Sequence, residues 1–290
     1  MYPVWIYILA GLWGGKRLVT ETVLLNYEQI ILIFFSTTMV MGSAYILNQI
    51  KDLETDRINN KFFLLTKDII SVKAAWIEAM ILFLLGLVLG FFLNSGIGSA
   101  LIVLFLLAGF CYNFAPLKLK NKPFGGMLIN GIGGYIIYSL GWSVVYDRFI
   151  LPVQGIPYFF AVLALYLNTT IPDYKGDKQT DKVTFSVKFG IKTTQIFALV
   201  CEIITLLTAL YFKDWILGIP AFLILPFFIR SCLKIDTSVS LQATKFAIAV
   251  LTVMICIVYI WYAVLVVFIF GMTKLYYHKR LNFNYPALKV

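Results

Sequence analysis

Two groups of oxygen-bearing side chains share one spacing in this sequence. Their members lie four residues apart, as Asn48, Asp52 and Asp56 in NQIKDLETD and as Asp173, Asp177 and Asp181 in DYKGDKQTD. Residues four apart lie on one face of a helix, so each group can direct several oxygens at one point. Mg²⁺ prefers oxygen ligands of this kind. Because the chain has only 14 Asp and Glu residues, we interpret the two matching groups as two Mg²⁺ sites rather than as a solvated surface.

Basic residues within or near the same segments indicate what the metal ions would hold. They are Arg57, Lys118, Lys120, Lys175 and Lys178. Carboxylate-bound Mg²⁺ together with Lys and Arg is a typical environment for phosphate oxygens. The pattern therefore predicts a site for a diphosphate. Aromatic residues, which form 17% of the chain, could line a cavity for the apolar remainder of the same substrate.

The elements that must position these residues are membrane-spanning helices. Hydrophobic residues make up 61% of the chain and charged residues 13%, which excludes a soluble fold and predicts one all-α integral membrane domain over residues 1–290. The first apolar run offers only about 20 Å of helix against a bilayer core of roughly 30 Å, so it must tilt, thin the bilayer or continue through Leu25. About nine transmembrane helices are predicted, at 2–14, 28–50, 74–93, 97–114, 124–146, 152–171, 194–212, 215–233 and 246–272.

The distribution of basic residues predicts how this bundle is oriented. The connections after the second, fourth, sixth and eighth runs carry 16 of the 24 Lys and Arg residues, so the positive-inside rule places them on the cytoplasmic side of the cell (inner) membrane. Both acidic groups lie at these connections and should therefore face each other in the cytoplasm. The opposite side keeps Lys16, Arg17, Arg148, Lys213 and, with nine helices, the tail residues Lys274, Lys279, Arg280 and Lys289. One miscounted span would move the tail to the cytoplasm and leave the two groups together.

Three stretches of the sequence resemble the UbiA superfamily of intramembrane prenyltransferases. NQIKDLETDRIN is similar to the first aspartate motif of that family, and IPDYKGDKQTDKVTFSVKFG is similar to its second. CYNFAPLKLK, at the end of the fourth run, resembles the family's segment with a tyrosine and lysines. The stretches occur in the family's order, and the resemblance covers nearly the whole chain.

The resemblance implies a helical bundle around a central cavity, in which two Mg²⁺ ions bind the diphosphate of a polyprenyl donor. Transfer of the prenyl group to a membrane-associated acceptor would release pyrophosphate. By position, one ion would be held by Asn48, Asp52 and Asp56, and the other by Asp173 and Asp177. Further diphosphate contacts would come from Arg57, Lys118, Lys120 and Lys178, and Tyr112 would stabilise the allylic cation. Acceptors used across the family include aromatic or quinone precursors, which we favour here, glycerol phosphate ethers and tetrapyrroles.

The chain departs from the family pattern at several positions. Phe62 and Phe63 follow the first motif where relatives commonly have an Arg-Pro pair, and Pro3 near the first run lacks its usual preceding Arg. Pro116 stands where many relatives have a lysine, which leaves the choice between Lys118 and Lys120 open. Asp181 occupies a position where relatives often have a small residue, so a supporting role behind the metal ligands is the alternative to ligation.

Other polar residues have a structural interpretation beside a functional one. Asn130 and Asn168, within apolar runs, could contact the acceptor, but hydrogen bonding between helices is the better account. The glycines of the fifth run predict close helix packing rather than a phosphate loop. The single His278 and the isolated Cys111, Cys201, Cys232 and Cys256 lack ligand spacing, which argues against zinc, haem or disulfides. The net charge of +10 suits an anionic membrane surface and substrate, and nucleic acid is not needed to explain it.

Two other classes of membrane protein also use intramembrane carboxylates. A cation-coupled transporter usually carries them near the bilayer midplane on broken helices, whereas here they lie at helix ends. A CDP-alcohol phosphotransferase would need a single Asp-Gly-initiated motif, which this sequence lacks.

Overall fold

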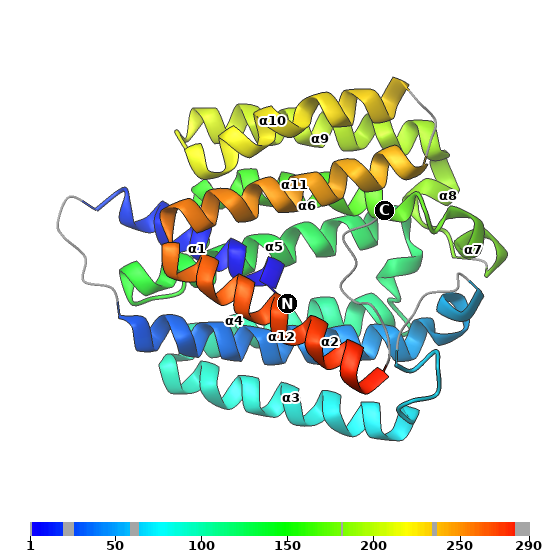
Figure 1. The fold of residues 1–290 in the computed structure, drawn as a ribbon, viewed down its shortest axis with the longest axis horizontal. Helices are drawn as coiled ribbons and strands as arrows, with labels where there is room; N and C mark the ends of the chain where they lie inside the picture. Colours follow the sequence, from blue (N-terminus) through cyan, green and yellow to red (C-terminus); the bar gives the residue numbers. More distant parts are fainter. Residues whose placement is uncertain (1, 20–25, 59–63, 181, 234–236, 282–290) are drawn as a thin grey trace.

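The computed structural model describes residues 2–19, 26–58, 64–180, 182–233 and 237–281 (Figure 1). Within these ranges the structure is helical, as the composition predicts. The short elements are two 3₁₀ turns at Leu119–Asn121 and Val153–Gly155, α7 (Tyr174–Gln179) and α8 (Phe185–Phe189). The long helices are α1 (Tyr2–Lys16), α2 (Tyr27–Ile58), α3 (Val72–Leu93), α4 (Ser95–Phe105) with a π-helical segment at Leu106–Cys111, α5 (Pro123–Tyr146), α6 (Ile156–Thr170), α9 (Ile191–Tyr211), α10 (Trp215–Leu233), α11 (Thr237–Val258) and α12 (Ile260–Leu281).

Seven of the described helices are long and apolar enough to cross a membrane, namely α2, α3, α5, α9, α10, α11 and α12. The apolar helix Ser95–Cys111 is shorter, and α1 and α6 have 15 residues each. A multi-pass integral membrane protein is therefore confirmed, whereas the count of nine spans is not. Local sequence explains several helix ends: Ser71 accepts a hydrogen bond from the backbone of Ala74 at the start of α3, and Asn94 caps α4 in the same way.

The prediction of one helix over 246–272 is wrong. The chain forms α11 and α12 there, with a break at Tyr259. Hydropathy could not reveal the break, because the sequence is equally apolar on both sides of it, whereas the structure buries Tyr259 and Tyr262 in the core at this point.

The break also corrects the position of the basic tail. Because α12 runs back along the bundle, its end lies at the same end of the molecule as α7 and the last turns of α2 (Figure 1). Lys274, Lys279 and Arg280 thus lie towards the end that carries the acidic groups, and not on the opposite side as predicted. Lys289 lies outside the described residues.

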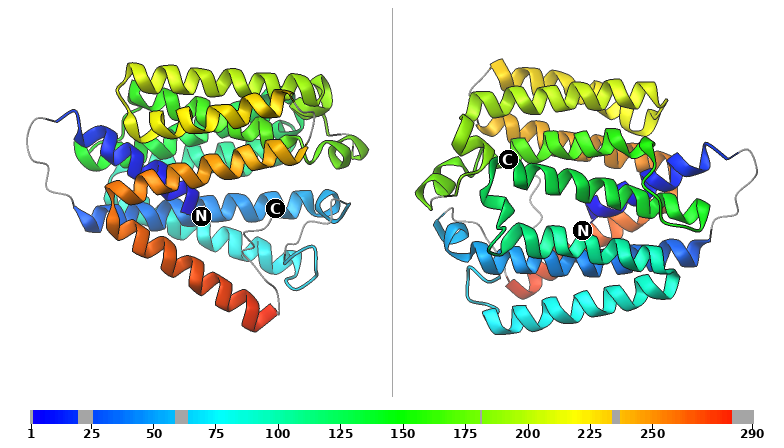
Figure 2. Two further views of the ribbon diagram at one scale, coloured as in Figure 1. Left: turned by 45° about the horizontal axis from the view of Figure 1, so that its top comes forward. Right: turned by 180° about the vertical axis from the view of Figure 1, so that it is seen from behind.

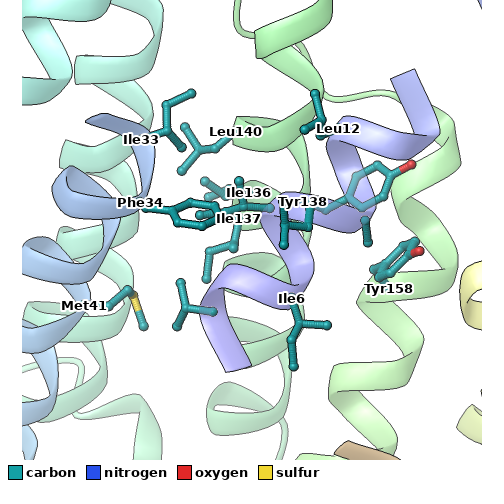
Figure 3. Close-up of a cluster of buried hydrophobic side chains, with 14 of the residues drawn as sticks. Ile6, Leu12, Ile33, Phe34, Met41, Ile136, Ile137, Tyr138, Leu140 and Tyr158 are labelled. Carbon is teal, nitrogen blue, oxygen red and sulfur yellow. The ribbon is translucent and has the colours of Figure 1, made fainter. Parts of the chain in front are cut away.

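The helices pack mainly as neighbouring pairs, with α1 on α5, α2 on α3, and α9 between α6 and α10 (Figures 1 and 2). A core of apolar side chains joins α1 and α2 to α5 and α6; Figure 3 shows Ile6, Phe34, Ile137 and Tyr158 converging within it. The two acidic groups are carried by the α2 end and by the α6–α7 junction, so this core fixes the distance between them.

Close contact between α1 and α5 depends on glycine. A Cβ atom on Gly141 would lie 1.8 Å from the carbonyl oxygen of Ile8, and one on Gly11 would lie 1.9 Å from that of Tyr138. Both distances are far below any possible contact with backbone, so the predicted packing role of the glycines is confirmed at Gly141. Gly133 differs, because an added Cβ would meet only Leu104 Cδ1 at 3.7 Å.

We expect Gly141→Ala to separate α1 from α5 and to lower the free energy of unfolding by about 1–3 kcal/mol, the usual cost of overpacking. Thermal melting of the detergent-purified protein would measure this. Gly271→Ala is the matched control, since a Cβ there meets nothing within 4 Å, and alanine should be neutral or slightly stabilising in a helix. Equal melting temperatures for the two variants would contradict the proposed contact.

Candidate active site

The structure brings both acidic groups to one polar pocket of about 310 Å³. The α2 helix continues past its apolar part to Ile58 and so carries the first group on its last turns. The second group lies at the start of α7. Seven residues predicted from the sequence line this pocket, namely Asn48, Asp52, Asp56, Tyr112, Lys120, Asp173 and Asp177.

Local backbone contacts explain how the second group is presented. The Asp177 amide donates to the Asp173 carbonyl at 2.8 Å, which closes one helical turn between the two carboxylates. The Lys182 amide donates to the Asp177 carbonyl at 2.9 Å, so the chain folds back after α7. This return places the Lys182 side chain in the pocket.

Two lysines neutralise Asp52. Lys120 Nζ donates to Asp52 Oδ1 at 2.8 Å, and Lys182 Nζ donates to the same oxygen at 2.6 Å. Lys182 Nζ also lies 3.9 Å from Asp177 Oδ1, so its ammonium group links the two acidic groups. Burial lowers the pKa of Lys120, and the facing Asp52 carboxylate partly offsets that effect.

Tyr112 lies where the polar pocket meets an apolar cavity of about 240 Å³. Tyr45, Asn48 and Tyr112 line both spaces, and the cavity extends from them to Val4 and Tyr7 of α1. Tyr112 shares the lining of the apolar cavity with Asn130 and that of the polar pocket with Tyr166. The polar pocket could therefore hold the charged head of a substrate and the adjoining apolar cavity its apolar tail. Tyr112 lies at the boundary between the two spaces.

Several residues predicted from the sequence lie away from the pocket. Arg57 pairs with Asp68 at 2.7 Å, and both side chains are exposed. Lys118 and Lys178 are also exposed, Lys118 in a left-handed backbone conformation and Lys178 with its ammonium group 5.9 Å from the Tyr174 ring. Of Lys118 and Lys120, only Lys120 lines the pocket.

The remaining polar candidates divide between the cavity and the core. Asn130 lines the apolar cavity, whereas Asn168 is fully buried and lines neither space. Asp181, Phe62 and Phe63 lie outside the described residues.

Sequence reasoning missed Lys182 and Tyr166 as pocket residues. Lys182 was one of the 16 basic residues used to predict the orientation of the bundle, and it was not predicted to line the site. Its position, five residues after Asp177, could have indicated that it lies close to the second acidic group. Tyr166 gave no signal, because an aromatic residue in an apolar run is ordinary in a membrane helix. Its hydroxyl fits against Gly126, where a Cβ would lie 2.1 Å away.

The donor atoms facing the pocket fit Mg²⁺ in kind. Asp52, Asp56, Asp173 and Asp177 offer carboxylate oxygens and Asn48 an amide oxygen, which are ligands that Mg²⁺ accepts. Within the described part of the chain, no three His, Cys, Asp or Glu side chains are gathered closely enough to hold an ion together. The ammonium groups of Lys120 and Lys182 supply the positive charge beside Asp52 instead.

We expect Lys182→Met to destabilise the metal-free protein by about 1–3 kcal/mol, because Asp52 and Asp177 lose the cation between them. Mg²⁺ should then restore more stability to the variant than it gives the wild type. Melting temperatures in EDTA and in excess Mg²⁺ would measure both effects. Lys178→Met, which removes an exposed lysine of the same loop, should behave as wild type; equal Mg²⁺ responses in all three proteins would contradict the linking role of Lys182.

Comparisons with known proteins agree with this architecture. The model of the UbiA prenyltransferase family matches residues 4–253. Digeranylgeranylglyceryl phosphate synthase of Methanosphaera stadtmanae is 29% identical over 181 residues, covering 62% of this chain and 64% of that protein. The 2-acylphloroglucinol 4-prenyltransferase of Humulus lupulus is 27% identical over 191 residues, covering 61% of this chain and 46% of that protein. The chain thus matches less than two thirds of the length of either relative.

Solved structures show the same fold. A UbiA homolog from Archaeoglobus fulgidus, bound to DMAPP and Mg²⁺, superposes with a TM-score of 0.64 at 18% identity, covering 87% of this chain and 95% of that one. With the family match over most of its length, the chain belongs to the UbiA prenyltransferase family.

Proposed function

We propose that the protein transfers a prenyl group from an allylic prenyl diphosphate to a lipophilic acceptor, in a Mg²⁺-dependent reaction that releases pyrophosphate. One observation carries this proposal. The polar pocket with its two acidic groups adjoins an apolar cavity through Tyr45, Asn48 and Tyr112. A diphosphate head and a prenyl tail need such a pair of spaces, whereas an ion pathway would need no apolar cavity beside its carboxylates.

Some of the site residues would act on the leaving diphosphate, and others on the allylic cation. Asn48, Asp52 and Asp56 would hold one Mg²⁺ ion, and Asp173 and Asp177 the other. Mg²⁺, when bound, draws negative charge from the diphosphate and makes it a better leaving group. Lys120 and Lys182 add positive charge at the same end of the substrate.

Ionisation of the donor breaks the allylic C–O bond, and the electron pair leaves with the diphosphate. Tyr112, at the boundary of the two spaces, would face the carbon that becomes cationic, and the face of an aromatic ring stabilises a cation. Apolar walls exclude the water that would otherwise trap it. The acceptor forms the new bond at that carbon and gives up a proton.

The lining of the apolar cavity favours a neutral aromatic acceptor, such as a quinone precursor. Among its described lining residues there is no Lys or Arg. A phosphate-bearing acceptor, as in the glycerol phosphate ethers, would bring a second anion with no cation to meet it, and burial of an unpaired charge is costly.

The pocket should face the cytoplasm. The connections at its end of the bundle carry most of the basic residues of the chain, and α12 runs towards the same end (Figure 1). The positive-inside rule assigns such an end to the cytoplasmic side.

Purified protein in detergent or liposomes would test the proposal. It would be incubated with dimethylallyl, geranyl or geranylgeranyl diphosphate and with a neutral phenolic acceptor or a glyceryl phosphate ether, with Mg²⁺ or with EDTA. Pyrophosphate release and a prenylated aromatic product by mass spectrometry, both lost in EDTA, are expected. Cation flux across liposomes without turnover would overturn the proposal in favour of a transporter.

A further inference from the structure

The end of the fourth apolar segment is wound as a π-helix at Leu106–Cys111. A π-helical turn bonds each amide one residue further back than an α-helix does, and such turns recur at functional sites. Just after it, the Asn113 side-chain amide donates to the carbonyl of Gly109 at 2.8 Å and to that of Ala108 at 3.2 Å. Asn113 is 1% exposed, so its side chain is buried against the carbonyls of the π-helical segment.

The other end of the Asn113 amide accepts a hydrogen bond from Lys120. Its Oδ1 lies 3.0 Å from Lys120 Nζ. The orientation of the amide follows from chemistry, since carbonyls can only accept and an ammonium group can only donate. Each half of the Asn113 side chain therefore faces a partner of the right kind.

Lys120 is fully satisfied in this arrangement. An ammonium group has three N–H donors, and Lys120 meets three oxygens, Asn113 Oδ1 at 3.0 Å, Asp52 Oδ1 at 2.8 Å and Asn48 Oδ1 at 3.3 Å. Its side chain is 4% exposed. Two of these oxygens belong to the first acidic group, and the third is anchored to the π-helical segment.

We propose that Asn113 is a positioning residue that fixes the Lys120 ammonium group at the wall of the polar pocket, by tying it to the π-helical segment. Asn113 does not itself line that pocket, so it acts through Lys120. The kinetic consequence rests on the proposed prenyl transfer: Asn113 would hold a positive charge ready for the leaving diphosphate. The structural consequence, an immobilised Lys120, does not depend on that function.

Amine acylation of the purified protein, followed by mass spectrometry, tests the structural consequence without any substrate. Lys120 in the wild type should react at least about tenfold more slowly than Lys118, which is exposed two residues away. Asn113→Leu removes both halves of the amide at similar size, and Asn113→Ser keeps a hydroxyl too short to reach Lys120. Either variant should raise the rate at Lys120 several-fold and leave Lys118 unchanged. If Leu prevents folding, Ser provides the test; an unchanged rate at Lys120 in a folded variant would overturn the proposal.

A double-mutant comparison tests the kinetic consequence. Asn113→Ser should lower kcat/KM for the prenyl diphosphate about tenfold, the usual scale for a hydrogen bond to a charged group. In a Lys120→Met background the same substitution should have almost no further effect, because the residue on which it acts is gone. A full tenfold loss in both backgrounds would overturn the positioning role. Absence of prenyl transfer in the wild type would instead refute the proposed function and leave the acylation result standing.

Discussion

Asp52→Asn and Asp177→Asn are each expected to reduce prenyl transfer about 10³-fold, the upper range for loss of one charge-stabilising group at a reacting centre. Both carboxylates are nearly buried in the pocket, at 9% and 6% exposure, and they come from segments far apart in the sequence. Removing either charge should leave one acidic group unable to hold a cation. The initial rate with excess donor, and the Mg²⁺ concentration that gives half of it, would be measured for each variant.

Asp68→Asn is the matched control for this pair. Asp68 has the same side chain and also pairs with a basic residue, but its side chain is 80% exposed and lies outside the pocket. It should keep wild-type activity and Mg²⁺ dependence, because an exposed ion pair contributes little. If Asp52→Asn and Asp177→Asn melt like wild type and retain its activity, the two carboxylates are not metal ligands and the proposed chemistry fails.

Gly133→Leu is expected to change which donors the protein accepts. Gly133 lines the apolar cavity, and an added Cβ there meets only Leu104 Cδ1 at 3.7 Å. A Cβ at this position therefore has room, and we expect the rest of a leucine side chain to extend into the cavity. Each isoprene unit that no longer fits would lose about 4 kcal/mol of transfer free energy, at roughly 0.8 kcal/mol for each buried carbon. For geranylgeranyl diphosphate this corresponds to a loss in kcat/KM of about 10³-fold per excluded unit.

Dimethylallyl diphosphate should be affected far less, since its short tail stays near the boundary at Tyr112. Competition between dimethylallyl and geranylgeranyl diphosphate, followed by mass spectrometry of the products, measures the ratio of the two kcat/KM values in one reaction. Gly133→Ala adds a single methyl group at ordinary contact distance and is the size control, with a small expected effect. An equal loss for both donors in Gly133→Leu would show that the prenyl tail lies elsewhere.

Composition and spacing determined the class of this protein and the identity of its two acidic groups. Apolar runs of bilayer length are a local property of the sequence, because backbone groups in lipid must be satisfied within each helix. The four-residue spacing of Asn48, Asp52 and Asp56 is equally local, and helix geometry alone puts them on one face. These signals were sufficient to predict the fold class, and the resemblance of three sequence stretches to known motifs indicated the family.

Tertiary structure decided which basic residues meet the acidic groups. Lys182 reaches Asp52 across 130 positions of sequence, and Lys120 reaches it across 68. No periodicity encodes such contacts, because they follow from how α2, the 3₁₀ turn before α5 and the return after α7 pack together. Arg57 and Lys118 are as close in sequence to the predicted motifs, yet the backbone directs both of them to solvent.

The break at Tyr259 and the role of Asn113 also depend on tertiary contacts rather than on local sequence signals. Hydropathy cannot distinguish one long apolar helix from two helices, since both bury the same kinds of side chains against lipid and protein. An asparagine at a helix end is likewise unremarkable until the π-helical segment and Lys120 are placed beside it. The sequence by itself specified the elements and the chemistry they carry, and only packing between distant elements decided which charges share the pocket.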